Sequence, residues 1–361
     1  MAPEPNAAGR MGLFRIVYAI FYLWHLSIFD LRAMSGMPRY HQSRPAMLAW
    51  LPDDPSPAMF QALEIVLVGA LVLLALGLRV RLMTFVVLLT GLVREAYPTT
   101  IDVENGNVFL VFYIPLFMLV AGSWGKTYSV DAARDRERDM PVVDPTDPGW
   151  RHFLPARAAL VVLAALFVSS PLFKCAFGGT WLERPDLIAN LMLQRSVQAA
   201  ALGLPINPLA PWIASHPTVA WALQLSILAF EGLFFLALFG RPLRNLFLAV
   251  SLVFHSINAL WMVVTFTPVL AVYGMFVDWQ WLRSKVGSRV LPSLSARTWT
   301  AIALVLAPAV ALTWHLGARA VFNAGGLVNW QTPWFVVLPL TTLWAARQVI
   351  RMCRLPAATA P

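Results

Sequence analysis

Charged residues are scarce in this chain. Asp, Glu, Lys and Arg together make up 12% of its 361 residues, whereas hydrophobic residues make up 59%. Soluble domains carry about 25% charged and about 45–50% apolar residues, so a water-soluble globule could not bury this much apolar surface. The composition excludes an ordinary soluble domain and indicates a membrane protein.

Cysteine and the usual metal-binding patterns are also scarce. The two cysteines, Cys175 and Cys353, form no CxxC motif, and no spacing of His and Glu specifies a metal site. The sequence has no nucleotide-binding loop and no Ser/His/Asp arrangement. We therefore expect neither a disulfide framework nor a bound metal. The net charge of +9 does not predict nucleic-acid binding, because the basic residues flank apolar runs.

Apolar runs fill most of the sequence. Each is about 16–21 residues long, close to the roughly 20 residues with which a helix crosses a bilayer. An open strand in lipid would leave backbone groups unpaired, so helix is the expected element. We predict an all-α polytopic transmembrane helical bundle of about ten spans. The expected spans are 12–29, 58–78, 82–98, 108–123, 153–170, 219–239, 246–262, 266–281, 298–314 and 334–350.

The basic residues predict the orientation of these spans. Most of the 27 Lys and Arg residues fall in segments that are cytoplasmic if the N-terminus is inside, as the positive-inside rule requires. We therefore expect both termini inside, in a bacterial plasma membrane. The first apolar run lacks a clear cleavage site and is interpreted as a retained span. One transmembrane domain is expected over residues 1–361, with a core at about 11–285 and further helices at about 298–350.

Several features leave alternatives open. Residues 246–281 form either one kinked helix or two short helices, and the basic segment after them favours two. The inner loop 124–152 is expected to be a solvated connector, and QRSVQAAALGLP in the outer loop 171–218 suggests an amphipathic helix at the interface. Two helix pairs, one with Glu64 and Arg94 and one with Glu231 and His255, are alike either by duplication or by chance.

Ionisable side chains in or beside the spans are the candidate functional residues, because a charge there costs about 2.5–3.5 kcal/mol. They are His25, Glu64, Arg94, Lys174, Glu231 and His255. Most fall in the expected outer half of the membrane, which indicates a pocket that opens away from the cytoplasm. Lys174 either snorkels to the interface or supplies an amine base. Glu231 and His255, near mid-membrane, form either a helix–helix contact or a proton-transfer pair.

Four stretches carry a family resemblance. They are GLFRIVYAIFYLWH at 12–25, ENGNVFLVFYIPLFMLVAGSWGKTYSVDA at 104–132, SPLFKCAFGGTW at 170–181, and the Glu231 helix followed by the His255 helix. In this order they resemble the HTTM (horizontally transferred transmembrane) superfamily, which includes the vitamin K-dependent gamma-carboxylases. The resemblance covers roughly residues 11–285.

This resemblance implies a role for each candidate residue. In the carboxylases, a lysine at the position of Lys174 is the base that deprotonates reduced vitamin K. The resemblance implies Lys174 as the catalytic base, with Glu231 and His255 as supporting catalytic groups. It also implies a quinone or quinol cofactor, with cofactor-binding residues Trp181, Glu64, Arg94 and His25. The sequence lacks the large extracytoplasmic domain that engages substrate peptide, so we expect a small or lipid-soluble substrate.

Two other functions remain open. The stretch ALEIVLVGALVLLALGLRVRL and residues 128–131 resemble the DoxX family, which implies an accessory subunit of a quinone-linked redox system with a redox partner protein. A small-solute transporter is the third alternative, because internal repeats and a mid-membrane carboxylate are typical of transporters. In each case the expected partners are membrane lipids and a small molecule, with no nucleic acid.

Overall fold

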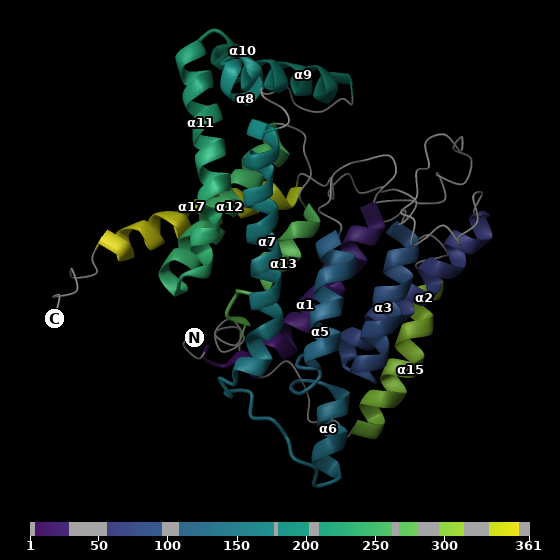
Figure 1. The fold of residues 1–361 in the computed structure, drawn as a ribbon. Helices are drawn as coiled ribbons and strands as arrows, with labels where there is room; N and C mark the ends of the chain where they lie inside the picture. The colour runs from purple at the N-terminus through teal and green to yellow at the C-terminus, as the bar shows by residue number, and fades with distance from the viewer. Residues whose placement is uncertain are drawn as a thin grey trace, which may run out of the picture. The chain divides into compact units, whose positions relative to one another are not determined.

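Every regular element that the structure describes is a helix (Figure 1). The computed structural model describes residues 4–28, 56–95, 108–176, 180–201, 209–261, 267–279, 296–313 and 332–353. The chain divides into two compact units. The first unit comprises Met1–Ala159 and Thr267–Asn329, and the second comprises Leu160–Phe266 and Trp330–Pro361.

Three of these helices are long and apolar enough to cross a membrane. They are Pro57–Leu76, Trp150–Ala176 and Pro217–Leu238. This finding supports an all-helical membrane protein, which is the coarser part of the prediction. The full number of spans and their orientation stay predictions.

The first unit is built around α2. Its elements are α1 (Ala7–Ile28), α2 (Pro57–Leu76), α3 (Val80–Glu95), the π-helical segment η5 (Phe109–Tyr113) with α5 (Ile114–Ala121), α6 (Val130–Glu137), the start of α7 (Trp150–Ala176), the 3-10 segment η7 (Thr267–Val269) with α13 (Leu270–Gly274), and α15 (Ala296–Thr313). Helix α2 packs against α1, α3 and α15, and α6 also packs against α15 (Figure 1).

Local sequence explains both ends of α2. The Ser56 hydroxyl accepts a hydrogen bond from the backbone N–H of Met59, which caps a free donor of the first turn. At the other end Gly77 adopts a left-handed conformation with φ of 78°, and its N–H donates to the carbonyls of Leu73 and Leu74. A glycine takes this conformation without a steric penalty. The α2 helix therefore stops here and the chain turns into α3.

Asp131 holds the start of α3 from another part of the chain. Its two carboxylate oxygens accept hydrogen bonds from the backbone N–H groups of Arg79 and Val80, at 2.9 and 2.8 Å. A carboxylate at a helix N-terminus satisfies free donors and complements the helix dipole. The Ser-x-Asp sequence at 129–131 thus has a structural role, because Ser129 also caps α6.

The second unit contains the rest of α7 and the elements that follow it. These are α8 (Thr180–Glu183), α9 (Leu187–Ala201), α10 (Leu209–Ala214), α11 (Pro217–Leu233) continued by the 3-10 segment η6 (Phe234–Leu238), α12 (Arg241–Trp261) and α17 (Thr332–Cys353). Helix α12 packs along α17, and the short helices α8 to α10 gather at the N-terminal end of α11 (Figure 1). Ile188, Met192, Ile213 and Ala220 form an apolar cluster between α9, α10 and α11.

Two expected connectors contain helices. In the loop 124–152, α6 packs on α15, and Arg134 donates a hydrogen bond of 2.9 Å to the hydroxyl of Thr300. The expectation of a solvated connector missed this helix, because its charged sequence has almost no apolar face. In the loop 171–218, α9 contains most of the expected amphipathic segment.

The region 246–281 contains more than one helical segment. Helix α12 ends at Trp261, and helix resumes at Thr267 with η7 and the five residues of α13. Residues 262–266 lie outside the described residues. Of the expected C-terminal helices, α15 belongs to the first unit and α17 to the second.

Candidate functional site

An ion pair joins α7 to α11 in the second unit. Lys174 lies in the last turn of α7, and its ammonium donates hydrogen bonds to both carboxylate oxygens of Glu231, at 2.8 and 2.7 Å. The Glu231 side chain is 7% exposed, whereas that of Lys174 is 21% exposed. The lysine of the pair is therefore partly exposed, whereas the carboxylate is buried.

Trp181 covers part of the same lysine. The Lys174 nitrogen lies 4.5 Å from the centroid of the Trp181 ring. A cation within about 6 Å of an aromatic face is attracted by the negative face of the ring. The structure thus brings together three residues that the sequence predicted, Lys174 and Glu231 as catalytic groups and Trp181 as a binding group.

An aromatic cluster fixes α7 against α11 below this pair. Phe167 of α7 stacks on Phe234 with ring centroids 4.1 Å apart, and it meets Phe230 edge-on at 5.5 Å. Phe247 and Phe254 of α12 extend the cluster. Aromatic pairs in these geometries add about 0.5–1.5 kcal/mol each beyond the burial of their area. The helices that carry Lys174 and Glu231 are therefore held in a fixed register.

His255, the third predicted catalytic residue, lies at this aromatic cluster. It is 4% exposed, and its ring centroid is 5.7 Å from that of Phe167 and 5.5 Å from that of Phe254. Phe167 precedes Lys174 by two helical turns, about 10 Å along the α7 axis. The structure therefore places His255 against an earlier part of α7 than the Lys174 turn.

The other predicted binding residues belong to the first unit. His25 of α1, Glu64 of α2 and Arg94 of α3 are all buried. Arg94 forms an ion pair with its neighbour Glu95. The structure thus places His25, Glu64 and Arg94 in a different unit from Lys174.

Sequence reasoning missed two buried residues of this first-unit group. Glu95 is the carboxylate that pairs with Arg94. Tyr22 is fully buried one helical turn before His25, with ring centroids 6.3 Å apart. The sequence signal was the spacing of three residues between Tyr22 and His25, which places both on one face of α1.

Sequence reasoning also missed Gln224 in the second unit. It is fully buried on α11, seven residues before Glu231. That spacing is about two helical turns, so both side chains project from the same face of the helix. A polar residue in phase with Glu231 in an otherwise apolar helix was the signal that could have identified it.

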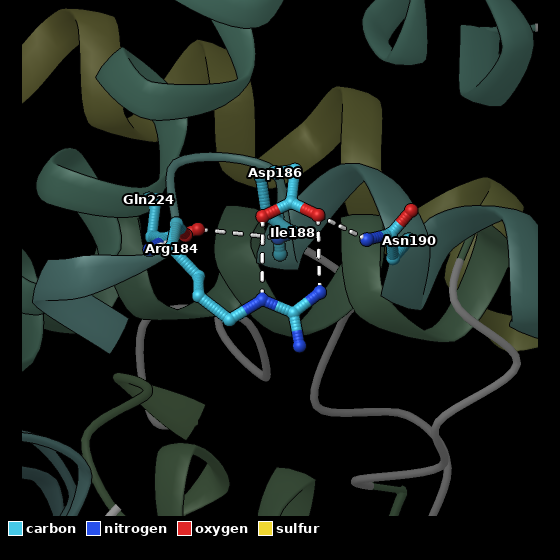
Figure 2. A network of polar contacts seen from close by, with 5 residues as sticks. All are labelled: Arg184, Asp186, Ile188, Asn190 and Gln224. Atoms are coloured by element: carbon cyan, nitrogen blue, oxygen red, sulfur yellow. Dashed lines mark hydrogen bonds and ion pairs between the residues drawn. The ribbon is translucent and has the colours of Figure 1, made fainter. Parts of the chain in front are cut away.

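A surface network fixes the turn between α8 and α9. Figure 2 shows the Arg184 guanidinium facing both carboxylate oxygens of Asp186, at 3.4 and 3.0 Å, with Asn190 donating to the same carboxylate at 2.6 Å. The hydrogen bond from Arg184 holds the pKa of the Asp186 carboxyl below its usual value. The same contact raises the pKa of Arg184. This turn follows α8, the short helix that contains Trp181.

Within the part of the chain that the structure describes, no three His, Cys, Asp or Glu side chains gather in a way that could hold a metal ion. The chemical groups at the Lys174 site are an amine, a carboxylate and an indole ring. Such a set can bind a polar group in an apolar environment and can move a proton.

Comparisons with known proteins add no family assignment. No protein-family model, no curated protein and no solved structure matches the chain. The likeness to the HTTM superfamily and to the DoxX family therefore stays a prediction from the sequence.

Proposed function

We propose that Lys174, Glu231 and Trp181 form a proton-transfer site for a quinol or another lipid-soluble molecule with an acidic hydroxyl group. The observation that carries this proposal is the bidentate pair between Lys174 and Glu231, whose lysine remains partly exposed. An isolated ammonium in an apolar region is costly, whereas a paired one is tolerated. The pair keeps a reactive amine at a place where a lipid-soluble molecule can reach it.

The proposed reaction begins inside the pair. The Lys174 ammonium transfers a proton to the Glu231 carboxylate, which leaves a neutral amine and a neutral carboxylic acid. This transfer creates no new net charge, so it costs less in an apolar environment than forming two separated ions would. The free electron pair of the amine can then accept a proton from a bound hydroxyl group.

The second step is deprotonation of the substrate. The hydroxyl bond of the quinol breaks, its proton forms a bond with the Lys174 nitrogen, and its electron pair stays on the substrate oxygen as a quinolate. Trp181 stabilises the ammonium that forms, because its ring face lies 4.5 Å from that nitrogen. The step needs no oxidant, and the quinolate is the activated product.

The proposal includes the topology predicted from the sequence. About ten spans, with both termini in the cytoplasm of a bacterial plasma membrane, would place the end of α7 at the outer side. The helices α2, α7 and α11–η6 are long and apolar enough to cross a membrane, which supports the membrane-spanning part of this proposal.

Binding of a quinol to Lys174 variants tests the proposal. The protein in lipid nanodiscs is titrated with a short-chain naphthoquinol under anaerobic conditions, and the absorption of bound quinolate is recorded. We expect quinolate formation in the wild type and its loss in Lys174→Met, with binding weakened about tenfold or more, as for a lost charge-assisted contact of about 1.5–3 kcal/mol. Glu231→Gln should bind quinol but form less quinolate, because the lysine then lacks its proton acceptor.

Lys126→Met is the matched control, because Lys126 is an exposed lysine and lies in the first unit. It should behave as the wild type does. Equal quinolate formation in the wild type and in a well-folded Lys174→Met variant would refute the proposal. Solute uptake without quinol binding would instead favour the transporter, and a stable redox partner with no bound quinol would favour the accessory subunit.

A further inference from the structure

Gln224 lies at the centre of the contacts between α11 and the segment that carries Trp181. Its side chain is fully buried. The amide nitrogen donates one hydrogen bond to the carbonyl of Trp181 and another, of 3.0 Å, to the carbonyl of Arg184. The amide oxygen accepts a hydrogen bond of 3.2 Å from the backbone N–H of Ile188, the contact drawn in Figure 2. Both donors and the acceptor of the amide are therefore used.

These three contacts join two helix ends. The carbonyls of Trp181 and Arg184 lie in and just after α8, and the N–H of Ile188 lies in the first turn of α9. Helix ends leave such groups without partners inside the helix. The Ile188 contact is buried, whereas the Arg184 carbonyl also accepts a hydrogen bond from the backbone N–H of Leu187. Gln224 therefore ties this segment to α11 chiefly through Trp181 and Ile188.

Two buried polar residues of α11, Gln224 and Glu231, thus hold the two partners of the contact between the Trp181 ring and the Lys174 ammonium. Glu231 binds the Lys174 ammonium, and Gln224 binds the backbone of Trp181, whose ring lies over that ammonium. Both are on the same helix, about two turns apart. The distance between the indole ring and the amine is therefore set through α11.

We propose that Gln224 is a positioning residue that places Trp181 over the Lys174 amine. The role of this contact in proton transfer rests on the function proposed above. The positioning itself does not, because it can be measured without substrate. A purely structural residue would stabilise the segment, but its replacement would not change the effect of the Lys174 charge on the Trp181 ring.

The test uses fluorine NMR of protein labelled with 5-fluorotryptophan in nanodiscs. The Trp181 resonance is assigned by its loss in Trp181→Phe. Lys174→Met should shift this resonance, because the ring loses the neighbouring charge. In a Gln224→Met background, we expect the Lys174→Met change to leave the Trp181 resonance unmoved. Gln224→Met keeps the side-chain volume but removes all three hydrogen bonds.

Two further variants keep the test decisive. Gln224→Asn retains the amide but is one methylene shorter, so it should reduce the shift and serves if Gln224→Met does not fold. Ser226→Ala is the matched control, because Ser226 is exposed on the same helix and its hydroxyl donates to the carbonyl of Ala222 in its own helix. It should leave the Trp181 shift at its wild-type value. A full Lys174-dependent shift in folded Gln224 variants would overturn the positioning role.

Quinol titration separates this inference from the proposed function. Folded Gln224 variants should bind naphthoquinol about 2- to 30-fold more weakly, the range that corresponds to loss of one cation–π contact. If the fluorine shifts behave as expected but no quinolate forms in any protein, the positioning stands and the proposed function fails. If quinolate forms equally in the wild type and the Gln224 variants, Trp181 placement has no part in the reaction. The role of this contact in proton transfer then fails, the function of Lys174 stands, and the fluorine shifts alone decide whether Gln224 positions Trp181.

Discussion

Arg15 and Lys174 are both cations in apolar helices, but their partners differ. The Arg15 guanidinium donates to the backbone carbonyls of Trp124, Tyr128 and Thr127 at 2.7, 2.6 and 3.3 Å. Among the described residues, Lys174 donates to a carboxylate alone. An arginine does not give up its proton in proteins, whereas a lysine can. At the scale of single residues, Arg15 is therefore suited to holding backbone and Lys174 to proton transfer.

Replacing Arg15 tests its structural role. Arg15→Lys should destabilise the protein by about 2 kcal/mol or more, because a lysine cannot reach the same fork of carbonyl groups and leaves some of them unsatisfied. Thermal unfolding in detergent, followed by the helical circular dichroism signal, measures the loss. Arg151→Lys is the control, because Arg151 is exposed and its guanidinium lies over the ring of the neighbouring Trp150. Equal melting temperatures for both variants would contradict the assigned role.

At the scale of elements, the turn between α2 and α3 is tightly packed against Ser129. A Cβ atom built on Gly77 would lie 2.3 Å from the Cβ of Ser129 and 2.7 Å from its Cα. Gly122 has a similar left-handed backbone at the end of α5, with φ of 59°, but no atom lies within 4 Å of its Cβ position. The two glycines therefore separate the cost of the backbone conformation from the cost of a clash.

Alanine substitution at these two glycines should give different results. Gly122→Ala should cost about 1–2 kcal/mol, which is the penalty of a left-handed backbone for an L-residue. Gly77→Ala should cost more than about 3 kcal/mol, because backbone atoms at Ser129 must also move. Denaturant unfolding in mixed micelles measures both values. A Gly77→Ala cost no larger than that of Gly122→Ala would show that the α2–α3 turn yields easily to the added methyl group.

At the scale of the whole molecule, the proposed topology makes a direct prediction about the two cysteines. Cys175 is a free, exposed cysteine next to Lys174 at the end of α7. The positive-inside assignment places it outside and Cys353 inside. A membrane-impermeant maleimide applied to intact cells should label the Cys353→Ser variant, which retains Cys175. It should label the Cys175→Ser variant only after the membrane is opened.

The variant that lacks both cysteines controls for reaction of the maleimide at other groups. The opposite labelling pattern in intact cells would show that the orientation is the reverse of the predicted one. Labelling of both single variants from outside would show that an even number of crossings separates the two cysteines, and the expected spans would then be wrong between them.

The sequence by itself determined the class of this protein. Scarce charge and repeated apolar runs predict helices in a membrane, because a backbone in lipid must satisfy its own hydrogen bonds. The same scarcity identified Lys174 and Glu231, since an ionisable group within an apolar run is noticeable without any structure. Gly77 after an apolar run is likewise a typical signal for the end of a helix.

Only the tertiary structure decided which of these groups meet. Lys174 and Glu231 are 57 residues apart in the chain, and their contact depends on how α7 packs against α11. Helical periodicity fixes which side chains share a face of one helix, but it contains no information about the neighbouring helix. For the same reason the sequence did not reveal that Gln224 binds the Trp181 backbone, or that His25 and Arg94 belong to a different unit from Lys174.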